Sequence, residues 1–390
     1  ASCIEAAADD AGHLREVRRL KDVKLEGESL WKRGRLVFET AQLAIGSHVA
    51  TGSLAIAHKG DEPNISGTLD FKTFDLAHLL ATGPSADDTG PTLEQWWSVI
   101  WDKLRNPMRA PLGVDLRLSA EQLKFGLADL GRSAMTLSLH KGTFRAQFAE
   151  IAFAGGEGSG ELGINFNRAR SNITIGGAVN NADITTINAL LPKALAMPLD
   201  GPARIELDLT TEGSNTREAI GRLAGTLRVL LPEGGALKLD ARKLSEISGV
   251  ASYETLAGET AIEKFSAELA FFNGQAFCRH LKALTATHVI EGAGSLDLDS
   301  LDVAFLGGVR EKPVKTAPEK PQAADGSAAT AAPSATPDPA NRRRPTFRLK
   351  GNVSALEVAP YQEARDKDLL SITPLFDPTR RRQRDRRSPG

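Results

Sequence analysis

Hydrophobic and polar residues alternate with a period of two along much of this sequence, and this alternation limits what the chain can fold into. In the stretch 204–210, Ile205, Leu207 and Leu209 alternate with charged and polar residues. Successive side chains of an extended chain point to opposite faces, so each such stretch has one apolar and one polar face. The same pattern recurs at 114–119, 296–299 and 347–350. Strands of this kind are typical of antiparallel sheets, and they predict a mainly β fold.

Paired glycines divide the alternating stretches into three similar repeats. The pairs are Gly34 and Gly52, Gly142 and Gly160, and Gly274 and Gly294. Each repeat indicates strand, turn, strand, turn and strand, and the first two continue into a short segment that ends in Leu-Leu. We therefore predict a repeated antiparallel meander that forms a long curved sheet or groove, with a few short amphipathic helices.

Length and composition are consistent with several β units. The chain has 390 residues, with 36 glycines but only 5% aromatic residues, which suits many turns between strands better than a helical bundle. The expected parts are a first β-repeat unit at 1–82, a Trp-rich helical insert at 83–110, a second β-repeat unit at 111–198, a C-terminal β/helix unit at 199–310, a disordered Ala/Pro linker at 311–345, final strands at 346–365 and a disordered Arg-rich tail at 366–390.

One segment, 93–105, has the spacing of an amphipathic helix and contains three of the four tryptophans. Two interpretations remain open: the helix covers the core or an edge of the sheet, or it contacts a membrane or the end of a groove. Its candidate residues are Trp96, Trp97, Ile100 and Trp101. Shorter helices are expected at 216–223 and 240–247.

The sequence offers no motif for catalysis, metal binding or a cofactor. Cys3 and Cys278 are too few for a disulfide framework or a thiolate zinc site. The segment 158–163 matches GxGxxG, but no helix follows, so we interpret it as a tight turn between strands. Asp297 is expected on a polar strand face. The net charge is −1 and the excess of Arg lies at 380–387, so we expect no nucleic-acid partner.

The stretch 179–242 resembles the C-terminal region of AsmA-family proteins. Asp183 lies in a segment that ends in Leu-Leu, an alternating strand follows at 199–214, and 223–227 reads Leu-Ala-Gly-Thr-Leu. A Gly-Ala strand then enters a helix that contains Asp240. The order of these parts carries the resemblance, which extends with less detail over most of 14–360.

The resemblance implies a protein of the Gram-negative envelope, placed in the periplasm and linked to outer-membrane biogenesis and phospholipid movement. Family members carry an N-terminal inner-membrane anchor, and the segment that would supply it is absent from this chain. They resemble bridge-like lipid carriers in which a curved sheet forms a groove, without a catalytic residue.

The apolar strand positions supply the candidate lipid-groove residues, namely Leu116, Leu118, Leu137, Leu139, Ile205, Leu207 and Leu209. An extensive apolar sheet face either packs against a second layer or carries an apolar molecule, and acyl chains would suit it. The expected partner is therefore phospholipid or another acyl-chain lipid, with membrane surfaces or outer-membrane assembly proteins as further partners. The alternative is an assembly factor that binds outer-membrane proteins by sheet-edge or groove contacts.

Overall fold

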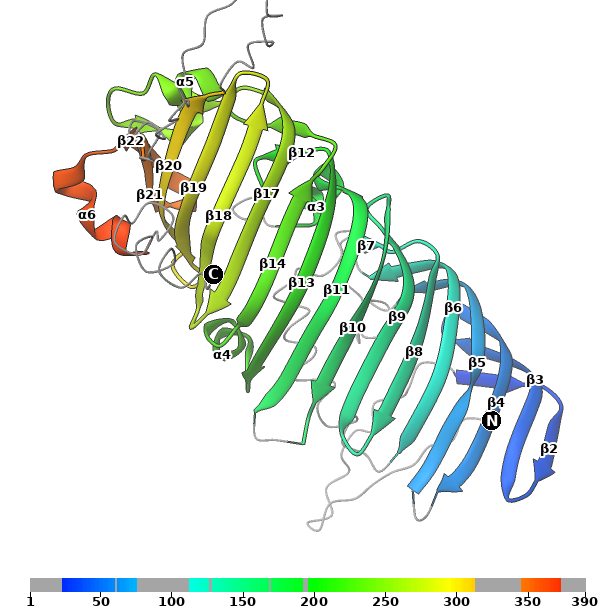
Figure 1. The fold of residues 1–390 in the computed structure, drawn as a ribbon. Helices are drawn as coiled ribbons and strands as arrows, with labels where there is room; N and C mark the ends of the chain where they lie inside the picture. The colour runs from blue at the N-terminus through cyan, green and yellow to red at the C-terminus, as the bar shows by residue number, and fades with distance from the viewer. Residues whose placement is uncertain are drawn as a thin grey trace, which may run out of the picture. The chain divides into compact units, whose positions relative to one another are not determined.

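Figure 1 shows the computed structural model, in which strands predominate and helices are few and short. The prediction of a mainly β fold is confirmed. The chain divides into two compact units, unit 1 (residues 1–177 with 212–216) and unit 2 (178–211 with 217–390). The structure describes residues 23–59, 62–75, 112–125, 128–167, 170–191, 196–312 and 345–372.

Unit 1 is a sheet in which most strands pair with the next strand of the chain. Its strands are β1 (Val23–Glu26), β2 (Ser29–Lys32), β3 (Arg35–Ile45), β4 (His48–Lys59), β5 (Glu62–Asp75), β6 (Gly113–Phe125), β7 (Ala128–Asp129), β8 (Ser133–His140), β9 (Thr143–Phe153), β10 (Gly156–Asn165) and the first part of β11 (Ser171–Asp183). Both β1 and β2 pair with β3, and among the described residues of unit 1 all strand pairs but one are antiparallel.

The exception is the parallel pair β5–β6, which departs from the expected antiparallel meander. Asn64 lies opposite Gly113 at one end of the pair, and Asp75 lies opposite Lys124 at the other end. Ile65 lies opposite Val114. Parallel neighbours need a long crossover connection, and residues 76–112 provide one between these two strands. The Trp-rich segment with Trp96, Trp97, Ile100 and Trp101 belongs to this connection and lies outside the described residues.

Unit 2 continues the same design and adds short helices. Its strands are β12 (Leu199–Asp200), β13 (Pro202–Gly213), β14 (Ala224–Leu231), β15 (Gly235–Leu237), β16 (Ala251–Ser252), β17 (Thr260–Phe272), β18 (Gln275–Thr285), β19 (His288–Asp297), β20 (Asp302–Glu311), β21 (Phe347–Asn352) and β22 (Glu357–Pro360). Its helices are α3 (Ile184–Leu190), α4 (Thr216–Gly221), α5 (Ala241–Ser245), the 3-10 turns η4 (Tyr253–Leu256) and η6 (Val353–Ala355), and α6 (Glu363–Ile372). The two short helices predicted from the sequence correspond to α4 and α5.

The first glycine of each repeat forms a hairpin turn. Gly34, Gly142 and Gly274 are each the second of two residues that connect neighbouring strands, and both residues of each turn have positive φ. Such two-residue turns match the twist of the strands, and glycine adopts positive φ without steric cost. The repeat seen in the sequence therefore corresponds to a repeated hairpin.

The second glycine lies inside a strand, where two backbones approach closely. A side chain at Gly52 would collide with the carbonyl oxygen of Thr68, and one at Gly294 would collide with Ala304. Strand β10 contains Gly160 and the whole GxGxxG segment 158–163, so the interpretation of that segment as a tight turn is wrong. The turn lies just before it, at residues 154–155.

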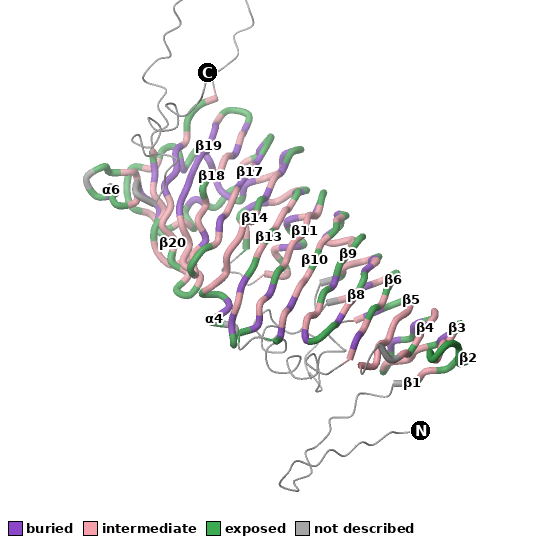
Figure 2. The backbone as a smooth tube through the Cα atoms, turned by 60° about the horizontal axis from the view of Figure 1, so that its bottom comes forward, coloured by how far each residue is buried: buried purple, intermediate pink, exposed green. Residues whose placement is uncertain are grey.

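The polar face of unit 2 is partly covered at its C-terminal end. Figure 2 shows buried backbone along β19, where residues on both faces are buried. Asp366 of α6 is 1% exposed, forms an ion pair of 3.1 Å with Arg348 of β21, and accepts a hydrogen bond from the Gln362 amide. The helix thus extends beyond residue 366, where we expected the disordered tail to begin; most of that tail and of the linker lies outside the described residues.

Candidate functional site

The apolar side chains of unit 1 form rows that run across its strands. Directly opposite residues in a sheet point to the same face, so the strand register identifies these rows. The first contains Trp31, Leu36, Ile56, Ile65, Val114, Leu139, Phe144 and Ile164. The second contains Phe38, Leu54, Gly67, Leu116, Leu137, Ala146 and Leu162. The third contains Ala41, Gly52, Leu69, Leu118, Met135, Phe148 and Gly160.

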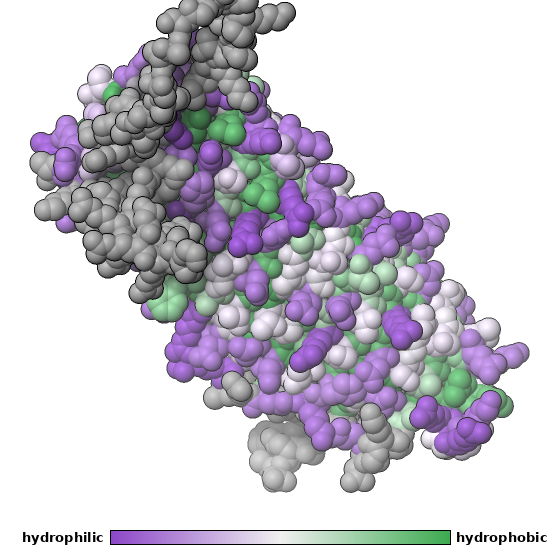
Figure 3. Space-filling view, viewed as in Figure 1, coloured by the Kyte–Doolittle hydropathy of each residue, from purple (hydrophilic) through white to green (hydrophobic). Residues whose placement is uncertain are grey.

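The four groove leucines predicted in unit 1 lie together on this face. Leu116 is directly opposite Leu137, and Leu118 and Leu139 belong to the rows on either side. Leu118 and Leu139 are buried, whereas Leu116 and Leu137 are half-buried. The residues that alternate with these leucines point to the other face of the sheet, which is polar. Hydrophilic side chains are frequent on the face of the molecule that Figure 3 shows. The sequence therefore identified the apolar face correctly, while its use for lipid binding stays a prediction.

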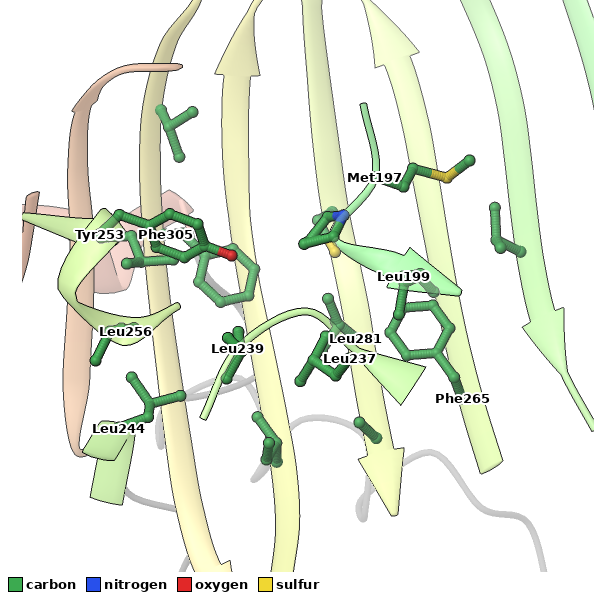
Figure 4. A pocket seen from close by; sticks show the side chains of 18 of the residues that line it. Met197, Leu199, Leu237, Leu239, Leu244, Tyr253, Leu256, Phe265, Leu281 and Phe305 are labelled. Carbon is green, nitrogen blue, oxygen red and sulfur yellow. The ribbon is translucent and has the colours of Figure 1, made fainter. Parts of the chain in front are cut away.

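The corresponding face of unit 2 contains a cavity of about 310 Å³. Its floor is the apolar face of β14 and β17–β21, and the segments opposite this floor come from elsewhere in the chain (Figure 4). The lining residues are Met197, Pro198, Leu199, Val229, Leu237, Leu239, Leu244, Tyr253, Leu256, Phe265, Ala267, Leu269, Cys278, Leu281, Ala283, Ile290, Val303, Phe305, Phe347 and Leu349. No charged side chain is among them.

The three groove residues predicted in unit 2 lie beside this cavity and do not line it. Ile205 is opposite Val229, which does line it, and Leu207 and Leu209 continue the same face along β13. All three are half-buried. The face predicted from the alternation is therefore the face of the cavity, but the cavity itself lies further along the sheet.

We call residues 196–200 and 235–256 the cover, because they lie across the apolar face of β17–β22. At one end β15 pairs with β17 through Leu237 and Thr260, and at the other end β16 pairs with β22 through Ala251 and Val358. Strands β17 to β22 pair in succession, so the covalent segment between β15 and β16 closes a ring around the cavity. Sequence analysis missed this ring.

Local hydrogen bonds explain why the cover folds as it does. Asp240 begins α5, and its carboxylate accepts hydrogen bonds from the amides of Arg242 and Lys243. Such N-caps satisfy helix amides that otherwise have no partner. The Thr260 hydroxyl donates to the carbonyl oxygen of Leu239 at 2.7 Å, which ties the cover to the start of β17. Leu239 and Leu244 then point into the cavity (Figure 4).

Glycines in the floor make room for the aromatic rings of the cavity. A side chain at Gly292 would overlap the ring of Phe305, and one at Gly307 would overlap the ring of Phe347. These rings therefore lie against the backbone of the neighbouring strand. The glycines thus influence how far the rings extend into the cavity.

Only two side chains of the lining carry a polar atom other than a thioether. Burial raises the pKa of the Cys278 thiol to about 12, so this cysteine is a poor nucleophile at neutral pH. Burial also raises the pKa of Tyr253, whose ring extends from η4 toward the middle of the cavity (Figure 4). Within the described residues, the Tyr253 hydroxyl has no hydrogen-bond partner. The cavity thus combines an apolar wall with one available hydroxyl group.

No family model, curated protein or solved structure matches this chain. The apolar faces, the cavity and the sequence resemblance are therefore what bears on function.

Other candidate sites are less informative. In the described part of the chain, no three His, Cys, Asp or Glu side chains come together as a metal site. Asp297 accepts hydrogen bonds from the amides of Asp299 and Ser300, which lowers its pKa and shapes the turn after β19. None of the helices described has the length and hydropathy needed to span a membrane.

Proposed function

We propose that this chain is an AsmA-like periplasmic protein of outer-membrane biogenesis, with the inner-membrane attachment that the resemblance implies. Its role would be to bind phospholipid, or to conduct it, along the apolar face of its sheets. The observation that carries the proposal is the set of apolar rows in unit 1. The first row continues from β2 to β10 and the other two from β3 to β10, across the strands and without a charged residue.

An acyl chain has the right chemistry for such a row. Removing each CH₂ group from water is worth about 0.8 kcal/mol, and an apolar row provides no polar group that would have to be desolvated. Movement along a row would exchange one set of similar contacts for another. The process needs no catalytic residue, and we propose a non-enzymatic role.

The first experiment is mass spectrometry of organic extracts from the purified chain, compared with a mock purification. Phospholipid enriched to a near-stoichiometric amount supports the proposal. A clean extract from folded protein contradicts it, and would mean that the apolar face packs on protein.

A matched pair of variants makes this experiment specific. Leu137 and Thr136 are neighbours on β8, and they point to the apolar and the polar face respectively. Leu137→Asp should strongly reduce the phospholipid that co-purifies, because it places a charge in the second row. Thr136→Asp adds the same charge on the polar face and should leave the lipid content unchanged. Circular dichroism identifies any variant that fails to fold.

A second candidate, the assembly factor that binds by strand addition, is favoured by the outer edge of unit 1. Among the described residues, β2 pairs only with β3, and Leu30 and Trp31 on β2 are 50% and 71% exposed. An exposed strand edge can pair with an extended peptide. Recovery of a bound peptide in place of lipid would favour this function.

A further inference from the structure

The cavity of unit 2 differs from the rows of unit 1 because it is a partly open pocket between a sheet floor and a cover. The ring of β17–β22 and the cover surrounds it, and it lies wholly within one unit. A ligand in this pocket would contact both the floor and the cover. The cavity is therefore a candidate for a defined binding site.

The volume of the cavity limits the size of its ligand. An apolar cavity of about 150 Å³ in another protein stays dry and takes up one benzene molecule. The volume here, about 310 Å³, is about twice as large, which corresponds to roughly a dozen carbon atoms. One acyl chain of this length fits in the cavity.

The polar groups of the lining determine which polar group of a ligand the cavity can accept. No Lys, Arg or His lines the cavity, so a buried carboxylate or phosphate would have no opposite charge. The Tyr253 hydroxyl is the one strong hydrogen-bond donor of the lining side chains, and, as in any tyrosine, it is protonated at neutral pH. A neutral carbonyl oxygen is the acceptor that such a donor suits best.

We propose that this cavity binds one acyl chain of an ester lipid, with the ester carbonyl accepting a hydrogen bond from Tyr253. The inference rests on the proposed function, because the ligand is again an acyl lipid. It adds a single-chain site to the apolar rows of unit 1. A neutral ester should therefore bind better than the free acid in its charged form.

The test is calorimetric titration of the full chain, first freed of lipid, with methyl dodecanoate, dodecanoate ion and dodecane. Methyl dodecanoate should bind most tightly. Dodecanoate ion and dodecane should each bind at least several-fold more weakly. Tyr253→Phe removes only the hydroxyl and should weaken methyl dodecanoate by up to about tenfold, the size of one hydrogen bond, while dodecane is unaffected. Equal affinity of wild type for the ester and dodecane, or equal losses in Tyr253→Phe, would overturn the role of Tyr253.

A second pair of variants tests the location. Leu281 lines the cavity, and its neighbour Lys282 on β18 points to the other face. Leu281→Trp should fill the cavity and reduce binding of methyl dodecanoate by more than tenfold, whereas Lys282→Trp should have no effect. Unchanged binding in a folded Leu281→Trp protein would overturn the site.

The two proposals can fail separately. Leu281→Trp should not alter the phospholipid held by unit 1, and Leu137→Asp should not alter the affinity for methyl dodecanoate. Phospholipid in the extracts together with no ester binding would reject the single-chain site alone. Ester binding by a chain that purifies without lipid would reject the proposed function.

Discussion

Unit 1 and unit 2 both have an apolar sheet face, but the side chains on these two faces pack differently. In unit 1 large side chains such as Phe71 and Leu69 fill a hydrophobic cluster with half-buried residues around it. In unit 2 glycines such as Gly292 and Gly307 occupy the floor, and a separate cover closes over a cavity. The difference shows that alternation alone does not decide whether a face is packed, open or enclosed. The cross-strand neighbours and the more distant segments decide it.

The largest expected effect tests the packing of unit 1. Phe71 is 2% exposed and its ring stacks on Phe74 at 4.3 Å. Phe71→Ala should lower the free energy of unfolding by about 3–5 kcal/mol, as for other buried aromatic residues. The half-buried Phe305 borders the cavity of unit 2. Phe305→Ala should therefore lower the free energy of unfolding by less, about 1–2 kcal/mol. Hydrogen exchange in urea, read by peptide, measures both; equal losses would contradict the comparison.

A smaller effect tests the glycine floor of unit 2. Gly307→Val would push the Phe347 ring away from β20. We expect this overpacking to lower the free energy of unfolding by about 1–3 kcal/mol. The control is Gly249→Val, because no atom lies within 4 Å of a side chain built at Gly249. Denaturant titration measures the difference. A Gly307→Val protein as stable as the control would mean that the glycine is not needed for the ring.

These contrasts also mark the limit of what the sequence predicts. Alternation identified the apolar face at Leu116 and Ile205, and the paired glycines identified the hairpin at Gly34, because both depend on local geometry. The ring depends on β16 pairing with β22, through Ala251 and Val358, which are far apart in the chain. Local patterns carry no information about such a pair.

The sequence indicated one strand and one helix of the cover, at β15 and α5, but not that the cover lies over the apolar face. The strands β12, β15 and β16 are only two or three residues long, which is too short for an alternating pattern to show which face they contact. Leu237 and Leu239 are an apolar pair two residues apart, but nothing local says which face they contact. The parallel direction of β6 relative to β5 leaves no mark in the alternating pattern of either strand.

The next effect concerns the helix that adjoins the cover. Asp183 begins α3, and its carboxylate accepts hydrogen bonds from the amides of Thr185 and Thr186. Asp183→Ala should lower the free energy of unfolding by about 1 kcal/mol, which is the usual contribution of an N-cap. Asp183→Asn should retain most of the stability, because its side-chain oxygen can still accept these hydrogen bonds. Hydrogen exchange of 184–190 distinguishes the two variants. A result in which both exchange alike would show that the cap is unimportant.

The smallest effect is a dependence of the cover on pH. Asp200 of β12 has a lowered pKa because the Thr185 hydroxyl donates to it at 2.6 Å, and Lys238 of the cover lies 3.0 Å away. A lowered pKa means that the unfolded state binds the proton more tightly, so this contribution is present above about pH 4 and is lost as the pH falls. Exchange of residues 196–200 should therefore rise at low pH more than that of β8 in unit 1, after correction for intrinsic rates. Asp200→Asn should remove this excess, because it leaves no group to titrate; an excess that persists in Asp200→Asn would assign the pH dependence to another group.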